Sequence, residues 1–201
     1  MRTALTRVVS WAHELLAEVA GGGQLAVDLT AGNGHDTLML WQLVAAKGQV
    51  VAFDVQPEAL QNTQLRLNEN GAIVRINRNE GILPALPGVD LVAAGHEHLE
   101  SYLPAAPQAI IANLGYLPGG DEALITQPRT TLLALQQAVA VLAPGGRLAV
   151  VVYPGHPGGE QEAEAVDGFF VGLEQHFFQV LQLKVVNRPE APYLQVAEKR
   201  K

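Results

Sequence analysis

Residues 25–37 read Leu-Ala-Val-Asp-Leu-Thr-Ala-Gly-Asn-Gly-His-Asp-Thr, an apolar run that carries Asp28 and leads into a loop with Gly32 and Gly34. A helical pattern begins directly after the second glycine. The stretch predicts a buried strand, a tight turn and a helix start. In that arrangement the backbone N–H groups of the turn can approach a nucleoside-like ligand. A glycine turn without any ligand is the alternative interpretation, and the carboxylates around this turn count against it.

A second carboxylate follows where a nucleotide site needs one. Asp54 ends an apolar run about 20 residues after Gly34, a spacing at which a carboxylate can bind ribose hydroxyls. The third glycine of a dinucleotide motif would fall at Thr37. Asp36 would repel a pyrophosphate, whereas it would attract the ammonium group of S-adenosylmethionine. The sequence therefore favours a methyl-donor site over an NAD site.

Composition limits the class of protein. The 201 residues contain no cysteine and 48% hydrophobic residues, with a formal net charge of −7. Disulfides, thiolate catalysis and cysteine zinc sites are excluded, and the acidic balance argues against broad binding of nucleic acid. No apolar run reaches the length of a membrane span. Residues 1–22 read as an amphipathic helix, not a signal peptide, so we expect a cytoplasmic protein.

Strand and helix patterns alternate along the chain. This alternation predicts an α/β fold with a mostly parallel sheet of seven strands, an antiparallel C-terminal strand, and a single domain over residues 1–201. Residues 70–87 do not fit seven strands, and we expect an insertion there with a short extra strand. The expected strands are residues 25–30, 49–54, 89–94, 109–113, 147–153, 178–186 and 193–198; the expected helices are 8–19, 36–46, 57–68, 128–142 and 160–176.

The stretch Asn113-Leu-Gly-Tyr-Leu-Pro-Gly-Gly-Asp121 follows the fourth of these strands. An Asn at a strand end with Tyr three residues later is typical of amine-methylating sites, although Leu-Gly stands where Pro-Pro is usual. The Asn113 carbonyl can accept hydrogen bonds from a nitrogen nucleophile, and Tyr116 can stack on a base. A neutral Asn also favours the ammonium form of an amine less than Asp would. The alternative is a simple Gly/Pro turn.

Histidines follow two other strands. His156 lies in the loop that begins at Tyr153, and it could accept the proton lost by an amine or simply contact substrate. His96 follows the third strand, where an adenine would rest. An ordinary loop histidine is an equal alternative for each. His96, Glu97 and His98 lie too close together in one loop to form a convincing ligand set, so we expect no metal site.

These motifs together resemble a bacterial family of tRNA 5-(aminomethyl)uridine methyltransferases, long described as rRNA methylases. The resemblance rests on residues 28–37, 53–56, 113–121, 152–159 and 196–199, and covers nearly the whole chain. It implies a Rossmann-like class I fold, S-adenosylmethionine as the methyl donor, tRNA as the partner, and a homodimer. Conversion of the aminomethyl group of a wobble uridine to methylaminomethyl is the implied reaction.

The residues and the resemblance together predict three groups of site residues. The catalytic candidates are Asn113 and Tyr116. The cofactor candidates are Asp28, Gly32, Asn33, Gly34, Asp36, Thr37, Asp54, Gln56, His96 and Asn113. The substrate candidates are Tyr116, Pro118, Gly119, Asp121, Arg129, Tyr153 and His156, where Arg129 is a candidate phosphate contact that a solvent-exposed role would explain equally well.

Other functions remain open at this point. A nucleotide-dependent oxidoreductase could use a similar fold, although Asp36 and Thr37 count against it. A non-catalytic S-adenosylmethionine-binding module would not need Asn113 and Tyr116. Methylation of rRNA or of a small-molecule amine would use the same residues, so the substrate follows from the resemblance alone.

Overall fold

A computed structural model describes residues 7–115, 126–155, 158–188 and 190–201. One sheet of eight strands runs through these residues in the order β3-β4-β2-β1-β5-β6-β8-β7. β8 pairs antiparallel with both of its neighbours, and every other pairing is parallel. The strands are β1 Leu25–Asp28, β2 Gln49–Phe53, β3 Val74–Asn77, β4 Gly88–Val92, β5 Ala109–Asn113, β6 Arg147–Val152, β7 Phe178–Leu183 and β8 Tyr193–Lys199.

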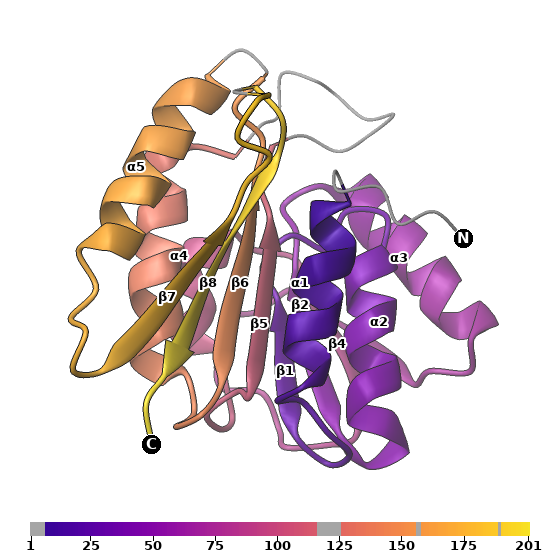
Figure 1. Ribbon diagram of the computed structural model, residues 1–201. Helices are drawn as coiled ribbons and strands as arrows, with labels where there is room; N and C mark the ends of the chain where they lie inside the picture. Colours follow the sequence, from indigo (N-terminus) through magenta and orange to yellow (C-terminus); the bar gives the residue numbers. More distant parts are fainter. Residues whose placement is uncertain (1–6, 116–125, 156–157, 189) are drawn as a thin grey trace.

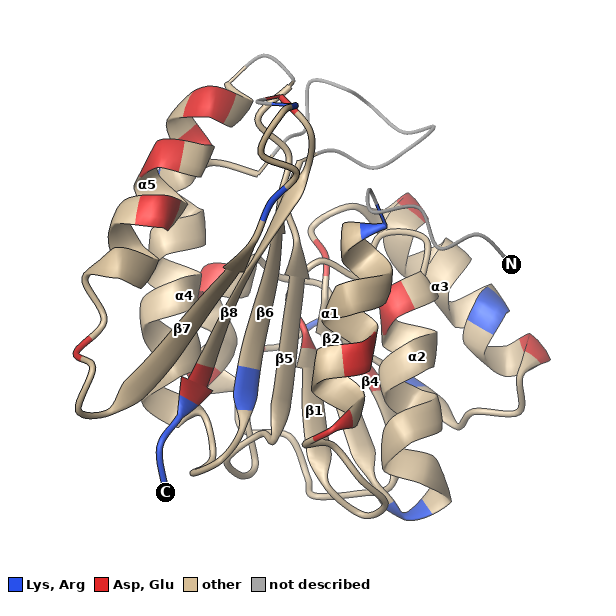
Figure 2. Cartoon of the chain, viewed as in Figure 1, with Lys and Arg blue, Asp and Glu red and all other residues tan. Residues whose placement is uncertain are grey.

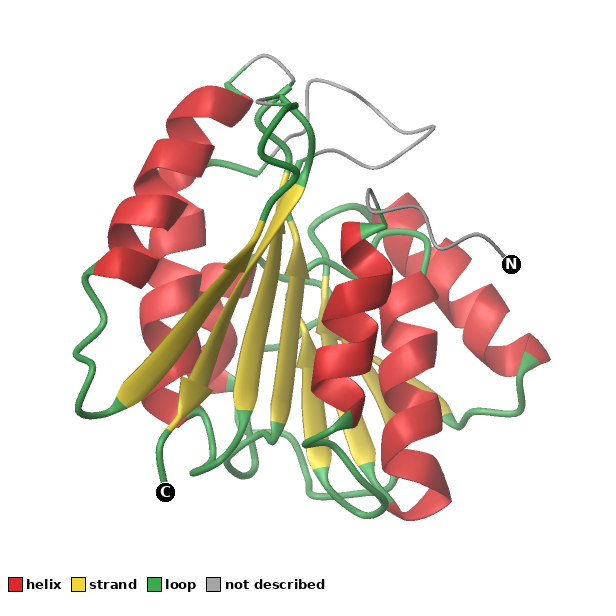
Figure 3. Ribbon diagram, viewed as in Figure 1, coloured by secondary structure: helices red, strands yellow, loops and turns green. Residues whose placement is uncertain are grey.

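Helices cover both faces of this sheet (Figures 1 and 3). The helical segments are α1 Val8–Ala17, α2 His35–Val44, η1 Ala45–Lys47, α3 Pro57–Glu69, η2 His96–Ser101, α4 Pro128–Val141 and α5 Gly159–Val171. Side chains of α1, α2 and α3 form one hydrophobic core on one face. Those of η2, α4 and α5 form a second core on the other face. The central strands are apolar on both sides because both of their faces are covered.

Alternation along the central strands divides their side chains between the two cores. Val27 and Ile110 pack with η2, α4 and α5, while their neighbours Ala26 and Ile111 pack with α1, α2 and α3. β1 lies between β2 and β5, so the strand order reverses at β1. Ligands of open α/β sheets bind at such a reversal, outside the carboxyl ends of the strands. The fold therefore brings the loops after β1, β2, β4 and β5 to one edge.

The sheet has eight strands, one more than the seven expected, and the eighth is the short extra strand expected within residues 70–87. β3 lies inside the segment expected as an insertion, and it pairs in parallel with β4 at the edge of the sheet. The strand expected at residues 89–94 is confirmed as β4, which ends at Val92 and pairs with β2. The extra strand arises because residues 70–87 carry a short alternating run that can extend the exposed edge of β4.

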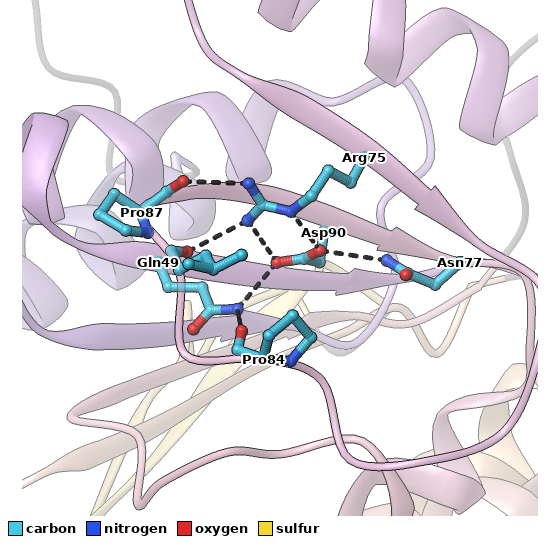
Figure 4. A network of polar contacts seen from close by, with 7 residues as sticks. Gln49, Arg75, Asn77, Pro84, Pro87 and Asp90 are labelled. Atoms are coloured by element: carbon cyan, nitrogen blue, oxygen red, sulfur yellow. Dashed lines mark hydrogen bonds and ion pairs between the residues drawn. The ribbon is translucent and has the colours of Figure 1, made fainter.

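A buried polar network fixes this extra strand (Figure 4). The Asp90 carboxylate accepts two hydrogen bonds of 2.7 Å from Arg75 on β3, and further bonds from Gln49 Nε2 and Asn77 Nδ2. Arg75 also donates to the carbonyls of Leu86 and Pro87. Burial alone would raise the pKa of Asp90, but these donors outweigh it and hold the pKa below its usual value.

The predicted antiparallel C-terminal strand is confirmed as β8, which lies between β6 and β7. Helix α5 ends at Val171, five residues before the expected end, and Gly172 follows it as the C-cap. Among the described residues, no helix is both long and apolar enough to span a membrane.

Candidate functional site

A cavity of about 800 Å³ opens at the carboxyl edge of the sheet. Its walls come from the loops after β1, β2, β4, β5 and β6, together with α1, α2 and α4. The residues that line it are Val9, Leu29, Thr30, Ala31, Gly32, Asn33, His35, Asp36, Phe53, Asp54, Val55, Gln56, Ala94, Gly95, His96, Glu97, Asn113, Leu114, Gly115, Thr126, Gln127, Thr130, Tyr153, Gly155, Glu190 and Pro192.

The glycine loop closes against the carboxylate that follows β2. Asp54 Oδ2 accepts a hydrogen bond of 2.9 Å from Gly32 N, and Oδ1 accepts one of 2.9 Å from Gln56 N. Burial raises the pKa of Asp54, and the backbone donors oppose that rise. Val55 N–H is a third backbone donor to this carboxylate. A carboxylate has about four lone-pair positions, so Asp54 can also accept from a ligand hydroxyl in the cavity.

Gly34 has a packing role in this loop. Its φ is +77°, and a Cβ at this position would lie 2.8 Å from Thr63 Cα on α3. Thr63 Oγ1 donates to Gly32 O at 3.0 Å. Gly34 therefore lets the loop and α3 approach closely, which is the part that a third glycine has in dinucleotide motifs. It does not line the cavity.

Asp28 is a fully buried carboxylate beneath the glycine loop. Its Oδ1 accepts from Thr30 N at 3.0 Å, and its Oδ2 accepts from Thr37 Oγ1 at 2.6 Å. Burial, and then the charge of Asp36, raise the pKa of Asp28 to about 7. Asp28 and Thr37 thus stabilise the start of α2 from behind the cavity wall and do not line it.

Asp36 connects two elements that are distant in sequence. Its Oδ1 lies 2.6 Å from His13 Nε2 on α1, and its Oδ2 accepts a hydrogen bond of 3.2 Å from Asn113 Nδ2 at the end of β5. The Asn113 backbone N–H donates to Thr30 Oγ1 at 2.8 Å. These contacts fix the Asn113 backbone and side chain in the wall of the cavity.

Tyr153 completes this side of the site. Burial and the charge of Asp36 raise the pKa of the Tyr153 hydroxyl, while a hydrogen bond with the Asn113 side chain lowers it in part. Tyr153, Asn113 and Asp36 therefore form one polar group, supplied by the ends of β6 and β5 and the start of α2.

His96 supplies an acceptor to the opposite wall. Its Nδ1 lies 3.2 Å from the carbonyl oxygen of Leu29, so Nδ1 carries the proton and donates. Burial lowers the pKa of His96 and favours the neutral ring. The buried Nε2 has no hydrogen-bond partner among the described residues. In a neutral ring it is an acceptor, and it can accept from a ligand N–H group.

The two ends of the segment between β5 and α4 are held together. Gly115 N donates to Thr126 Oγ1, and Thr126 N donates to Gly115 O, both at 2.9 Å. Thr126 Oγ1 also donates to Glu162 on α5 at 2.7 Å, and Glu162 accepts a second bond from Thr131. The buried Glu162 thus holds Thr126, and through it Gly115, in the cavity wall.

The predicted site residues separate into four groups. Gly32, Asn33, Asp36, Asp54, Gln56, His96, Asn113 and Tyr153 line the cavity, whereas Asp28, Gly34 and Thr37 support it from outside. Arg129 is exposed in the first turn of α4 and does not line the cavity. Tyr116, Pro118, Gly119, Asp121 and His156 lie outside the described residues.

Sequence reasoning missed His13, Thr30 and Thr126. Thr30 stands within the quoted loop and could have been found from its place at the strand end. His13 and Thr126 gave no local signal, because their contacts cross 23 and 36 residues of sequence to Asp36 and Glu162. Among the described residues, no group of three or more His, Cys, Asp or Glu side chains could hold a metal ion.

Known proteins are similar to this chain in sequence and fold. Residues 50–199 match the family described as "Putative rRNA methylase". The chain belongs to this family. A chloroplastic tRNA (mnm5s2U34)-methyltransferase from Arabidopsis thaliana is 36% identical, over 94% of this chain and 68% of that protein.

Solved structures similar to this chain include methyltransferases. A "putative rRNA-methylase" from Clostridium thermocellum is 33% identical and has a TM-score of 0.86, over 96% of this chain and 97% of the other. A "putative methyltransferase" from Streptococcus mutans in complex with SAH is 36% identical with a TM-score of 0.81, over 96% and 98%. The chain is a methyltransferase with the α/β fold of these relatives.

Proposed function

We propose that this protein is an S-adenosylmethionine-dependent N-methyltransferase that converts the 5-aminomethyl group of a wobble uridine in tRNA to 5-methylaminomethyl. The observation that carries the proposal is that one cavity contains two sets of side chains. Asp54 and His96 can bind the ribose and adenine of the donor, and Asn113 and Tyr153 can orient a substrate amine. The tRNA methyltransferase from Arabidopsis and the SAH complex from Streptococcus mutans support the substrate and the donor.

The chain's residues fit the donor at three points. Asp54 has lone pairs for ribose hydroxyls, and the buried acceptor His96 Nε2 can take an adenine N–H. The Asp36 carboxylate lines the cavity and would attract the ammonium and sulfonium groups of the donor. Bound S-adenosylmethionine would supply a methyl group for in-line displacement from sulfur.

The remaining chemistry is positioning of the nucleophile. The Asn113 carbonyl oxygen accepts a hydrogen bond from the neutral amine and aims its lone pair, and the walls of the cavity exclude water. The amine loses its proton before attack, and a second proton leaves after methyl transfer. Tyr116 and His156 remain candidates for base stacking and proton acceptance.

Binding of tRNA would depend on local contacts. Lys and Arg are spread over several elements in Figure 2, and the net charge is −7. We retain Arg129 as a candidate phosphate contact beside the cavity, with Pro118, Gly119 and Asp121 as candidate substrate residues. Arg129→Ala would lower the salt dependence of tRNA affinity by about one phosphate contact. An unchanged slope would remove Arg129 from the site.

We also propose that residues 1–201 act as a single domain and that the protein is a cytoplasmic homodimer. β7 supports self-association, because it lies at the edge of the sheet and exposes Val180 and Leu181 beside Phe177. Sedimentation of the full chain would give a dimer mass. A monomer at micromolar concentration would contradict it.

The test of function uses tRNA from a strain that lacks the gene. Purified protein with S-adenosylmethionine should convert 5-aminomethyl to 5-methylaminomethyl uridine, read by mass spectrometry of nucleosides. If the protein methylated rRNA or small amines but not tRNA, the tRNA assignment would be wrong and one of these alternatives would be the substrate. Binding of S-adenosylmethionine without methylation of any of these substrates would indicate a non-catalytic module. If NADH bound more tightly than S-adenosylmethionine, the assignment of S-adenosylmethionine as the donor would be wrong.

A further inference from the structure

Helix α1 contacts the cavity wall through His13. Val9, His13 and Leu16 lie at i, i+4 and i+7, so they share one face of α1. Val9 lines the cavity and Leu16 is fully buried in the core. His13 lies between them with its Nε2 2.6 Å from Asp36 Oδ1. The helix thus presents an imidazole to a carboxylate in the cavity wall.

Asp36 contacts Asn113 as well as His13. A carboxylate can only accept, so the Asn113 group that lies 3.2 Å from Asp36 Oδ2 must be the NH₂ group. The Asn113 carbonyl oxygen then points away from Asp36. This orientation leaves the carbonyl oxygen free to accept from an amine, and the reverse orientation would put two oxygens in contact.

We propose that His13 is a positioning residue for methyl transfer: it holds the Asp36 carboxylate, which in turn orients the Asn113 amide with its carbonyl oxygen toward the substrate amine. The proposal rests on the proposed function of Asn113. His13 does not line the cavity, so it would act on the reaction through Asp36. Its effect is on the geometry of the reacting nitrogen, so it should change turnover more than donor affinity.

The alternative is that His13 only anchors α1 to the domain. α1 has a second polar anchor that does not reach the cavity: Arg147 Nη1 donates to Glu18 Oε2 at 2.6 Å and to Leu15 O at 2.7 Å. Glu18→Gln weakens this anchor and leaves the His13–Asp36 contact in place. It is therefore a matched control for loosening of α1.

The experiment measures kcat, the Kd of S-adenosylmethionine and thermal melting for the full-length protein. His13→Phe keeps a planar ring but removes the donor, and should lower kcat by about tenfold while Kd changes by less than about threefold. His13→Gln keeps an N–H donor near the same place and should restore most of the rate. Glu18→Gln should turn over like the wild type. His13→Ala replaces the Phe variant if the latter fails to fold.

A double variant tests whether His13 acts through Asn113. If it does, adding His13→Phe to Asn113→Ala should slow the reaction little beyond Asn113→Ala alone, because the group being oriented is already absent. Multiplication of the two effects would overturn the proposal. So would a wild-type rate for His13→Phe, or an equal loss of rate in Glu18→Gln.

A readout without activity separates this inference from the proposed function. The side-chain NH₂ signals of Asn113, assigned by their loss in Asn113→Ala, should shift in ¹⁵N spectra of His13→Phe and stay in place in Glu18→Gln. If the wild type methylates no amine, the proposed function fails and these spectra still decide the coupling. Unmoved Asn113 signals in His13→Phe would overturn the coupling.

Discussion

Two buried aspartates of the sheet have opposite environments. Asp90 on β4 and Asp28 on β1 are both fully buried. Asp90 has a two-bond contact with Arg75, and its pKa lies below the usual value. Asp28 has only a hydroxyl and a backbone N–H as donors, and its pKa rises to about 7. A fixed cation neutralises the first carboxylate, and no such cation contacts the second among the described residues.

This difference separates a structural carboxylate from one beside a ligand site. The Arg75–Asp90 network holds an added edge strand, and its charges cancel within the fold (Figure 4). Asp36 and Asp54 line one cavity, with Asp28 behind its wall, and no Lys or Arg among the described residues lines that cavity. Carboxylates in such a wall can attract a cationic ligand. We infer that the carboxylates around the glycine loop lower the stability of the fold and favour binding of the donor. The Arg75–Asp90 contact between β3 and β4 stabilises the fold and has no part in binding.

The largest expected effect comes from Arg75→Met, which would leave Asp90 buried without its cation. Removal of one partner of a buried ion pair costs about 3–5 kcal/mol, so the free energy of unfolding should fall by that order. Denaturant titration measures the loss. The double variant Arg75→Met/Asp90→Leu should recover part of it, because no unpaired charge remains.

The same variant should leave the cavity intact. The Kd of S-adenosylmethionine, measured by calorimetry below the melting temperature, should match the wild type. If folded Arg75→Met protein bound the donor more weakly than the wild type, the β3–β4 region would be coupled to the cavity. Asp90 could then no longer be described as a purely structural carboxylate.

Asp28→Asn tests the other side of the contrast through pH. At pH values below about 4, Asp28 is protonated in both the folded and the unfolded chain. Between about pH 4 and pH 7 it ionises in the unfolded chain but stays protonated in the fold, so stability falls as pH rises. Since each pKa unit is worth about 1.4 kcal/mol, the whole loss is on the order of 4 kcal/mol.

Asn cannot ionise, so the variant should lack this part of the pH dependence. Its free energy of unfolding should fall less than that of the wild type between pH 4 and pH 7, in parallel urea titrations. Glu58→Gln, an exposed substitution on α3, is the control and should follow the wild type. Parallel curves for Asp28→Asn and wild type would mean that Asp28 is ionised in the fold.

Asn113 variants should change turnover. Asn113→Ala removes the acceptor that orients the amine, and should lower kcat by about a hundredfold. Asn113→Asp keeps the shape but adds a charge that favours the unreactive ammonium, so its rate should recover as pH rises toward the pKa of the amine. An Asp variant that equals the wild type at neutral pH would show that neutrality at this position is unimportant.

The sequence predicted most of the fold, for reasons that are visible in particular residues. Apolar runs such as Gln49–Phe53 are buried on both faces, so their pattern alone identified central strands. Val74–Asn77 was harder, because an edge strand is half-exposed and depends on its partner. Its main anchor is the contact between Arg75 and Asp90, which are 15 residues apart.

The cavity lining was predictable where it followed strand ends. Asp54, His96 and Asn113 line the cavity because parallel strands bring their carboxyl ends to one edge, and their roles in binding and catalysis stay predictions. His13 was missed because its partner is set by how α1 packs on the sheet, which no local pattern encodes. Asp28 and Thr37 were expected to contact the cofactor, but the structure puts them behind the wall of the cavity, and their roles in binding stay predictions.

The smallest expected effect is on donor binding by Asp54. Asp54→Ala removes a charged acceptor for ribose hydroxyls, a loss of about 1.5–3 kcal/mol in the binding free energy of S-adenosylmethionine. Calorimetry gives this directly. The substitution also removes the acceptor of Gly32 N and Gln56 N, so part of the loss could come from a looser glycine loop.

Asp54→Asn helps to separate the two causes, because its carbonyl oxygen can still accept from one of the two backbone N–H groups while the charge is gone. If ribose binding requires the charge, both variants should bind donor more weakly, and the melting temperature should fall less in Asp54→Asn than in Asp54→Ala. Equal donor affinity in wild type and Asp54→Ala would place the ribose elsewhere. Asp54 would then resemble Asp90, a carboxylate that serves the fold, and the contrast between the two regions would narrow to Asp28 and Asp36.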